Sequence, residues 1–187
     1  MIIKISDEEL KNSRPSLEAL EKTTRNPVVV LLENIRSLYN VGSIFRSSDG
    51  ALIEKLFLTG YTGYPPRKEI DKTSLGSVES VPWEYQANSL EAVKKLKSNN
   101  YQIVSLEQTS KSIPYNKASY QFPLCLILGN EVKGISPEIL QESDLAIDIP
   151  MLGRKQSLNV TVAYGIVLYH LITKYKFANP IYGLEKP

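Results

Sequence analysis

Five short apolar runs, rich in β-branched residues, constrain the fold of this chain more than any other feature of its sequence. They are residues 28–32, 56–59, 103–106, 124–128 and 145–149. Continuous runs of this length are typical of strands that are buried on both faces. Helical patterns lie between the runs, at about residues 41–52, 90–97 and 137–141. This alternation predicts an α/β fold, with helices on both faces of a mostly parallel sheet.

Capping signals and chain length predict how the chain is divided. Ser6 and Glu9 match a capping box, which starts a helix near the N-terminus. Ser136 before Pro137 predicts a helix that begins with a cap and a first-turn proline. A chain of 187 residues is long enough for one core but not comfortably for two. We expect a helical extension, one α/β domain and a tail, at residues 1–25, 26–176 and 177–187.

The last predicted helix, from Asn159 to about Tyr175, carries more apolar surface than one partner can cover. Its apolar residues exceed a single stripe: Val160, Val162, Ala163, Ile166, Val167, Leu168, Leu171 and Ile172. A helix of this kind packs against the sheet and also against a second surface. A second copy of the chain is the obvious candidate, so a homodimer is expected.

Composition argues against several functions. The net charge of +2 permits a nucleic-acid partner without requiring one. A lone Cys125 and a lone His170 argue against an internal disulfide and a protein-built zinc site, so no metal is expected. The sequence shows no signal-peptide pattern, and no apolar stretch reaches the ~18 residues that a membrane span needs. We expect a cytoplasmic protein without a membrane partner.

Three segments that follow predicted strands carry glycines and polar residues that packing alone does not explain. In the first, at 34–46, Asn40 and Gly42 are expected to open a helix, with Arg46 about one turn inside it. Free N–H groups at a helix start and a guanidinium fork both suit a phosphate. The alternative is a capped helix with a solvated arginine.

The other two segments are 128–136 and 149–160. The first of these leaves a core strand through two glycines, which let a ligand approach the backbone at the carboxyl end of a strand. The alternative is an ordinary turn. The second ends at a helix that Ser157 or Asn159 is expected to cap. The usual G-x-G-x-x-G and G-x-x-x-x-G-K-[ST] nucleotide fingerprints are absent from the sequence.

Together the three segments resemble the SpoU (or TrmH) family of RNA ribose methyltransferases, within the SPOUT superfamily. The family pattern N-x-R-x-x-x-N-x-G-x-x-x-R is met by Asn34, Arg36, Asn40, Gly42 and Arg46. The pattern L-G-N-E-x-x-G is met at 128–134, and I-P-M-x-G-x-x-x-S-L-N-V at 149–160. The resemblance covers about residues 26–175. It implies a C-terminal deep trefoil knot and a homodimer with its site near the interface.

The resemblance also implies the cofactor and the site. S-adenosylmethionine is expected in the knot, and a methyl group is expected to pass to a ribose 2′-hydroxyl of structured RNA. The implied cofactor-binding residues are Leu106, Glu107, Leu128, Gly129, Asn130, Gly134, Ile149, Met151, Ser157 and Leu158. The implied catalytic residues are Arg46, Asn40, Glu131, Ser157 and Asn159.

Each implied catalytic residue has an expected role. A guanidinium keeps its protons at neutral pH and is a poor general base. We therefore expect Arg46 to bind the substrate phosphate and stabilise the developing alkoxide, while the phosphate or a water takes the proton. Asn40 is expected to position the ribose or Arg46. Glu131 is expected to organise its loop, and Ser157 and Asn159 to complete the pocket.

RNA needs a positive surface, which we expect from Arg36, Arg46, Arg67, Lys68, Lys72, Arg154 and Lys155. Tyr61 and Tyr64, in a long polar loop expected at 60–76, are available for stacking. Plain solvation is the alternative for Arg67 and Lys68. Transfer RNA is favoured slightly over ribosomal RNA. Two other functions stay open, a non-catalytic RNA-binding protein with this fold and a flavodoxin-type nucleotide-binding domain.

Overall fold

A parallel sheet of seven strands forms the centre of the molecule, in a computed structural model that describes residues 2–179. The strand order is β3-β2-β1-β6-β4-β7-β5, and every neighbouring pair is parallel. The predicted α/β fold with a mostly parallel sheet is therefore confirmed. The strands are β1 (Asn26–Glu33), β2 (Ile53–Thr59), β3 (Trp83–Gln86), β4 (Gln102–Leu106), β5 (Ile113–Pro114), β6 (Leu124–Leu128) and β7 (Leu145–Asp148).

The five apolar runs correspond to β1, β2, β4, β6 and β7. β6 lies between β1 and β4, and all five of its residues are buried, as its continuous apolar run predicted. β3 and β5 were not predicted. They are the two edge strands, and neither contains a buried residue, so the burial that selects apolar residues is missing from both.

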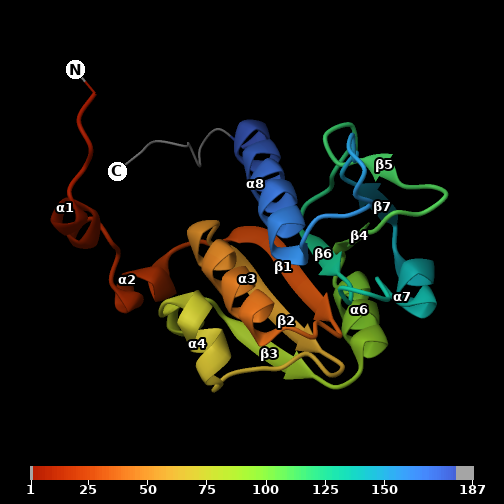
Figure 1. Ribbon diagram of the computed structural model, residues 1–187, viewed down its shortest axis with the longest axis horizontal. Coiled ribbons are helices and arrows are strands. Elements are labelled where there is room, and N and C mark those ends of the chain that lie inside the picture. The colour runs from red at the N-terminus through yellow and green to blue at the C-terminus, as the bar shows by residue number, and fades with distance from the viewer. Residues whose placement is uncertain (1, 180–187) are drawn as a thin grey trace.

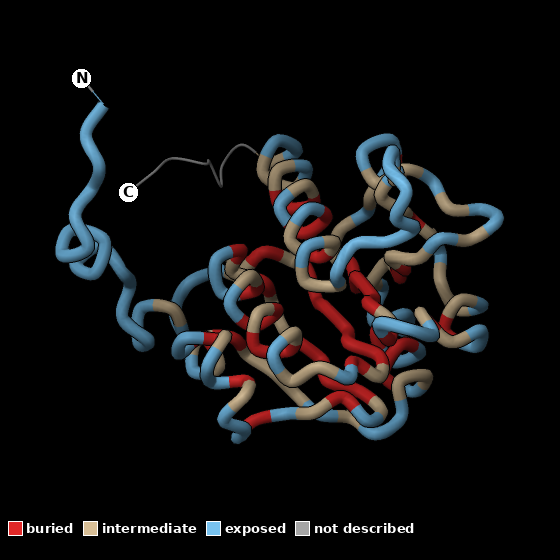
Figure 2. The backbone as a smooth tube through the Cα atoms, in the orientation of Figure 1, coloured by how far each residue is buried: buried red, intermediate tan, exposed pale blue. Residues whose placement is uncertain are grey.

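Helices cover both faces of the sheet, as predicted. α3 (Leu38–Gly50) and α8 (Val160–Ala178) lie in front of it in Figure 1, whereas α6 (Ser89–Ser98) and α7 (Pro137–Glu142) pack on the other face. Alternate residues of β1 supply the two cores, because successive side chains of a strand point to opposite faces. Val30 packs with α3 and α8, and Leu31 packs with α6 and α7. Figure 2 shows the strands as a buried band between these layers.

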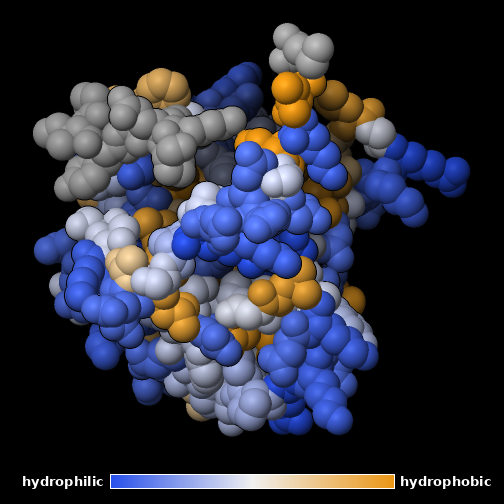
Figure 3. All heavy atoms as spheres, turned by 90° about the vertical axis from the view of Figure 1, so that its left-hand side faces the viewer, coloured by the Kyte–Doolittle hydropathy of each residue, from blue (hydrophilic) through white to orange (hydrophobic). Residues whose placement is uncertain are grey.

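The N-terminal segment adds two helices, α1 (Asp7–Asn12) and α2 (Leu17–Lys22), neither of which has a buried residue. The predicted capping box is present, since Ser6 Oγ accepts the N–H of Glu9 and the Glu9 carboxylate accepts the N–H of Ser6. Figures 1 and 2 show α1 standing away from the sheet. Figure 3 faces this side of the molecule and shows hydrophobic side chains near the start of the chain. The division of the chain at residues 25 and 176 stays a prediction.

Two expectations near the chain ends and loops need correction. The last helix was expected to end near Tyr175, but α8 continues to Ala178. Most of the predicted tail, residues 180–187, lies outside the described residues. The segment 60–76 is not a continuous loop, because it contains α4 (Lys68–Ser74), and α5 (Ser77–Ser80) follows directly. α4 packs on α3, and that tertiary contact outweighs the weak local helical signal.

Helix starts also differ from the expectation. Asn40 and Gly42 do not open α3; Ser37 caps it, and its Oγ accepts the N–H of Asn40 at 3.3 Å. Gly42 lies inside the helix, and glycine is needed there because a Cβ would come within 2.3 Å of the Ile70 carbonyl oxygen on α4. Arg46 consequently lies about two turns into α3 rather than one.

The start of α7 has the predicted backbone, but the predicted side-chain cap is missing. Pro137 is the first helical residue, as predicted. The hydroxyl of Ser136 does not cap the helix, and it has no hydrogen bond with any described residue. The backbone N–H of Ser136 instead donates to the Glu33 carboxylate at 2.9 Å. No helix within residues 2–179 is long and apolar enough to cross a membrane.

Candidate active site

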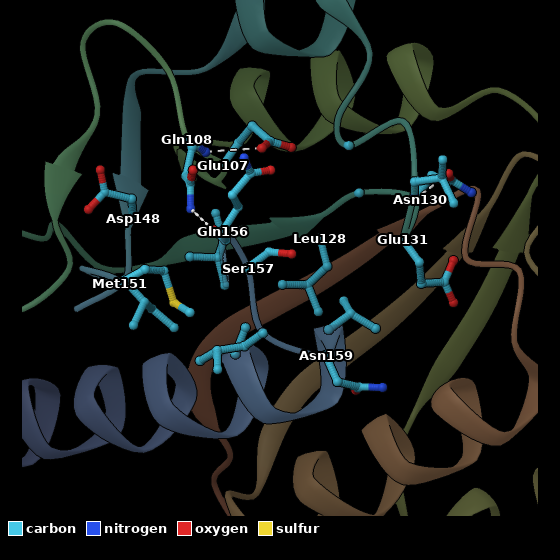
Figure 4. A pocket seen from close by; sticks show the side chains of 18 residues that line it. Glu107, Gln108, Leu128, Asn130, Glu131, Asp148, Met151, Gln156, Ser157 and Asn159 are labelled. Atoms are coloured by element: carbon cyan, nitrogen blue, oxygen red, sulfur yellow. Dashed lines mark hydrogen bonds between the residues drawn. The ribbon is translucent and has the colours of Figure 1, made fainter. Parts of the chain in front are cut away.

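A cavity of about 400 Å³ opens at the carboxyl ends of β4, β6 and β7 (Figure 4). These strands are neighbours in a parallel sheet, so their carboxyl ends share one edge, where ligands bind in open α/β folds. The wall comes from the end of β4, the loop after β6 and the segment that joins β7 to α8. All ten predicted cofactor-binding residues line it: Leu106, Glu107, Leu128, Gly129, Asn130, Gly134, Ile149, Met151, Ser157 and Leu158.

The loop after β6 owes its shape to Asn130, which is only 6% exposed. The side-chain oxygen of Asn130 accepts the N–H groups of Val132 at 3.0 Å and Lys133 at 2.8 Å. The backbone of Asn130 pairs with Gly134 in both directions. These bonds hold the loop as a tight turn, because an asparagine side chain can substitute for backbone partners in a short loop.

Glycines bring this loop close to its neighbours. Gly134 has a φ of +69°, and a Cβ there would lie 2.3 Å from a carboxylate oxygen of Glu107. A Cβ on Gly129 would lie 2.4 Å from the backbone of Gly134. Only glycine fits both positions without movement of the surrounding chain, and it leaves backbone groups accessible at the cavity wall.

The end of β4 connects the other two parts of the wall. The Glu107 carboxylate accepts the N–H of Ile135 at 2.9 Å, in the loop after β6, and the N–H of Gln108 at 3.0 Å. The Gln108 amide donates to the carbonyl of Gln156 at 2.6 Å, in the segment after β7 (Figure 4). The three segments therefore hold one another in place around the cavity.

Acidic side chains give the cavity its charge. Glu107, Glu131 and Asp148 line the wall, and none of its lining residues is a lysine, arginine or histidine. Apolar side chains of Leu106, Leu128 and other residues cover much of the remainder. A cavity of this kind suits a ligand that combines an apolar or aromatic body with a positive charge.

Glu131 joins the loop after β6 to the segment after β1 beside the cavity. Its carboxylate accepts the N–H groups of Arg36 at 2.9 Å and Ser37 at 3.1 Å, and the side-chain amide of Asn40 at 2.9 Å. The amide of Asn159, the N-cap of α8, donates to the Asn40 side-chain oxygen at 3.4 Å. Asn40 thus contacts two other predicted catalytic residues, Glu131 and Asn159, and a fourth, Ser157, lines the adjoining cavity.

Hydrogen bonds also set the ionisation of Glu131. Partial burial raises the pKa of this carboxyl, but the donors from Arg36, Ser37 and Asn40 outweigh burial and hold the pKa below its ordinary value of 4.5. Glu131 is therefore an ionised acceptor at neutral pH. Its contacts support the organising role that the sequence predicted.

Arg46 is the predicted residue that the structure does not bring to the cavity. It is exposed on α3, does not line the cavity wall, and has no hydrogen bond or ion pair with any described residue. The other predicted RNA-binding cations are also exposed: Arg36, Arg67, Lys68, Lys72, Arg154 and Lys155. Arg154 and Lys155 line a second, more open hollow that shares Gln108 with the first. These cations are therefore accessible to a large ligand.

Comparison with known proteins agrees with this geometry. The model of the SpoU rRNA Methylase family matches residues 27–169, which is most of the chain. The chain belongs to the SpoU methylase family. This confirms the resemblance that the three segments carried, and the matched range includes every residue that lines the cavity.

Individual members of the SpoU family are similar over most of this chain. The tRNA (guanosine(18)-2′-O)-methyltransferase of Aquifex aeolicus is 34% identical over 153 residues, which cover 81% of this chain and 71% of that protein. The crystal structure of the A. aeolicus TrmH/SpoU tRNA modifying enzyme matches with a TM-score of 0.78 and 30% identity, over 89% of this chain and 85% of that one.

A second similar structure was solved with a cofactor. The AdoMet-bound rRNA methyltransferase of Sinorhizobium meliloti matches with a TM-score of 0.74 and 27% identity. The match covers 86% of this chain but 60% of the S. meliloti protein. The core fold is therefore shared, whereas the S. meliloti chain has additional residues.

The cavity includes residues that were not among the predicted site residues. They are Gln108, Val132, Asp148, Gln156, Val160 and Ala163. Most of them adjoin a predicted residue, and Ala163 lies one helical turn beyond Asn159. These residues line the cavity because the end of β4, the loop after β6 and the segment after β7 meet there. In the sequence they lie close to predicted residues, but their residue types gave no sign of a binding role.

Proposed function

We propose that this protein transfers a methyl group from S-adenosylmethionine to a ribose 2′-hydroxyl of structured RNA. The observation that carries the proposal is that the second and third SpoU segments line one cavity, while the first segment contacts both of them through Asn40, which bonds to Glu131 and Asn159. The activities named for the A. aeolicus and S. meliloti relatives support it. The three contacting residues also argue against a non-catalytic RNA-binding protein.

The cavity fits the proposed cofactor. A volume of about 400 Å³ falls within the range of roughly 300–1,000 Å³ for small-molecule sites. The apolar side chains of Leu106, Leu128 and Ile149 would hold the adenosine, and the acidic wall suits the positively charged end. The backbone around Gly129 and Gly134 would supply hydrogen bonds. When bound, the sulfonium supplies an activated methyl group, so the protein's task is alignment.

The chain's own residues would orient the ribose and steady its charge. Asn40 and Asn159 offer amide groups, and Glu131 fixes their loop. Ser157 would complete the pocket. Arg46 would reach the phosphate of the substrate and stabilise the alkoxide electrostatically, with the phosphate or a water as the proton acceptor. Because Arg46 has no partner among the described residues, its guanidinium is free to bind RNA.

We propose transfer RNA as the substrate, with ribosomal RNA as the alternative. The relative named as a tRNA methyltransferase is aligned over 71% of its length, whereas the S. meliloti rRNA enzyme is aligned over 60%. The exposed cations Arg67, Lys68 and Lys72 on and beside α4 would contact RNA phosphates, and Arg154 and Lys155 would do so beyond the cavity. Such a protein would act in the cytoplasm, where its RNA is processed.

A homodimer is part of this proposal. On α8, Val162, Ile166 and Tyr169 are spaced i, i+4 and i+7 and are 50%, 37% and 52% exposed. This spacing gives one apolar stripe on the side of the helix that does not face the sheet. A second copy of α8 would cover the stripe and place two sites near the interface.

A trefoil knot is the second feature that membership of the SpoU family supports. After β7 the chain passes Gln108 and continues into α8, where His170 contacts Tyr115 and Tyr120 of the β5–β6 connection. We propose that this segment is threaded through that connection. Stretching single molecules from their two ends would test it, since a knotted chain reaches a shorter final length than an open one. A full-length extension would refute the knot.

Methyl transfer provides the direct test of function. Purified protein is incubated with radiolabelled S-adenosylmethionine and unfractionated tRNA or rRNA, and the labelled nucleosides are separated after complete digestion. We expect label in 2′-O-methylnucleosides of tRNA. Label on a base, or no label in either RNA, would refute the proposal. Label in rRNA alone would support the alternative substrate.

A further inference from the structure

Tyr61 is an exposed aromatic residue that is held at both ends. It follows β2 and is 60% exposed. Its backbone N–H donates to the side-chain oxygen of Asn34 at 3.0 Å, and its hydroxyl accepts the side-chain amide of Asn130 at 2.8 Å. Burial does not explain this order, because most of the ring faces solvent. The two bonds are therefore the reason that the ring has a fixed orientation.

The surroundings of Tyr61 are built for this arrangement. Asn34 has a φ of +59° and the adjoining Gly60 has a φ of +64°. A Cβ on Gly60 would lie 2.1 Å from the side-chain oxygen of Asn34, the same atom that accepts the Tyr61 N–H. Two left-handed residues on different loops thus fit each other. Gly60 adopts this conformation readily, whereas holding Asn34 there costs free energy that its contacts must offset.

The position of Tyr61 connects it to the candidate active site. Asn130, which bonds to the hydroxyl, lines the cavity, and the next residue, Glu131, binds Asn40. Figure 4 shows Asn130 and Glu131 at the same side of the cavity. The exposed ring thus stands beside the place where a target ribose would lie. A fixed aromatic face loses little entropy when a flat partner stacks on it.

We propose that Tyr61 is a positioning residue for the substrate: its ring stacks on an unpaired nucleobase of the RNA, and its bond to Asn130 fixes the ring relative to the cofactor cavity. This rests on the proposed function. It adds that the substrate must present a base that is not stacked inside a duplex, since aromatic side chains stack on splayed bases of loops and single strands. The substrate class is therefore a loop of a structured RNA.

Two RNA probes separate stacking from charge. One is a labelled hairpin with a seven-base loop, and the other is the same hairpin with its loop annealed to a complementary strand. Fluorescence anisotropy gives both affinities at low salt. We expect wild-type protein to prefer the open loop, and Tyr61→Leu to lose about five-fold or more of its affinity for the open loop alone. The control Arg67→Ala/Lys68→Ala should weaken both complexes equally, because phosphates are present in each.

A second pair of variants tests the hydroxyl. Tyr61→Phe keeps the ring but loses the bond to Asn130, and should lose part of the preference for the open loop. Tyr64→Phe is the matched control, because the Tyr64 hydroxyl has no hydrogen bond within residues 2–179. Calorimetry with S-adenosylhomocysteine, without RNA, should show a much smaller loss for either Tyr61 variant than the loss of RNA affinity.

The outcomes are distinguishable. If wild-type protein prefers the open loop and Tyr61→Leu keeps that preference, this inference is wrong and the proposed function is unaffected. If both Tyr61 variants lose cofactor affinity as strongly as RNA affinity, Tyr61 has only a structural role. If Tyr61→Phe matches wild type, the part assigned to the hydroxyl is wrong. If wild-type protein binds neither RNA, the proposed function fails and the inference fails with it.

Discussion

The Glu131 carboxylate organises the part of the candidate site that adjoins the start of α3. It accepts hydrogen bonds from the 36–37 backbone, which precedes α3, and from Asn40 in the first turn of that helix. A single carboxylate thus accepts backbone N–H groups at the start of α3 and in the preceding loop that would otherwise have no acceptor. It also links the segment after β1 to the loop after β6, which are about a hundred residues apart in the chain.

The pKa of Glu131 gives a prediction about acid stability. A carboxyl whose pKa is lower in the folded chain than in the unfolded chain stabilises the fold at any pH above its unfolded-state pKa. This contribution is lost as the pH falls through its folded-state pKa. As the pH falls below 4.5, the ordinary pKa of the Glu131 carboxyl, wild-type protein should therefore lose the stability that Glu131 provides. We expect Glu131→Gln to have a lower melting temperature than wild type at about pH 7, with the difference shrinking by about pH 3.5.

Glu138→Gln is the control for this measurement. Glu138 is exposed in the first turn of α7 and has no side-chain hydrogen bond or ion pair within the described residues. Its melting temperature should follow that of wild type at every pH. If the difference in melting temperature between Glu131→Gln and wild type stays constant down to about pH 3.5, the role assigned to Glu131 is contradicted.

Arg46 carries the sharpest prediction about chemistry. Arg46→Ala should reduce methyl transfer by roughly a hundred-fold or more, because an electrostatic contact to the developing charge is lost. Affinity for S-adenosylmethionine, measured by calorimetry, should stay within about two-fold of wild type, because Arg46 does not line the cavity. Arg14→Ala, an exposed arginine after α1, should behave as wild type in both assays. Loss of cofactor affinity in Arg46→Ala would refute the role.

At the scale of elements, the decisive unit is the loop after β6. Its turn is closed by Asn130, its backbone is placed by Gly129 and Gly134, and Glu107 at the end of β4 fixes its far side. The Asn130 bonds are local and the Glu107 bond joins two segments, and together they determine whether the cavity wall is formed. The loop is therefore expected to be more sensitive to small steric changes than most exposed segments.

Two glycines provide a matched test of this loop. Gly134→Ala must place a Cβ 2.3 Å from the Glu107 carboxylate at a positive φ, which costs about 1–3 kcal/mol. We expect Gly134→Ala to bind S-adenosylmethionine at least roughly five-fold more weakly than wild type, measured by calorimetry. Gly153→Ala meets nothing within 4 Å and should bind normally. Equal affinity of the two variants would show that the loop does not hold the cofactor.

At the scale of the whole molecule, α8 has two faces with different partners. Tyr164, Leu168 and Leu171 are fully buried against the sheet and α3, and Ser48 of α3 shares a hydrogen bond with the Tyr164 hydroxyl at 2.7 Å. The stripe of Val162, Ile166 and Tyr169 remains exposed in a single chain. The same helix begins at Asn159 in the candidate site, so association through α8 would bring two sites together.

The dimer prediction is tested by a charge in the stripe. Ile166→Asp should shift the protein from dimer to monomer in sedimentation analysis, because an unpaired carboxylate is costly to bury in an apolar interface. Its melting temperature at low protein concentration should change little, because Ile166 is 37% exposed in the single chain. Leu75→Asp, at an exposed position that follows α4, should leave the assembly intact. A wild-type protein that is monomeric would contradict the proposal.

Much of this protein was readable from local patterns. Buried strands such as β6 select continuous apolar residues, and helix starts such as Ser6 leave capping signals. The spacing of glycines and polar residues after β1, β6 and β7 was enough to recognise the SpoU family. These features are local because strand burial, capping and tight turns each depend on residues within a few positions of one another.

The remaining features required the folded chain. The contacts of Glu131 with Asn40, of Gln108 with Gln156 and of Tyr61 with Asn130 join residues tens of positions apart, and no local pattern encodes such pairs. The helical conformation of 68–74 and the exposure of Arg46 were likewise set by packing. Local sequence specifies which conformations a segment prefers, whereas the sheet order determines which segments meet, and the meeting places are where the site is built.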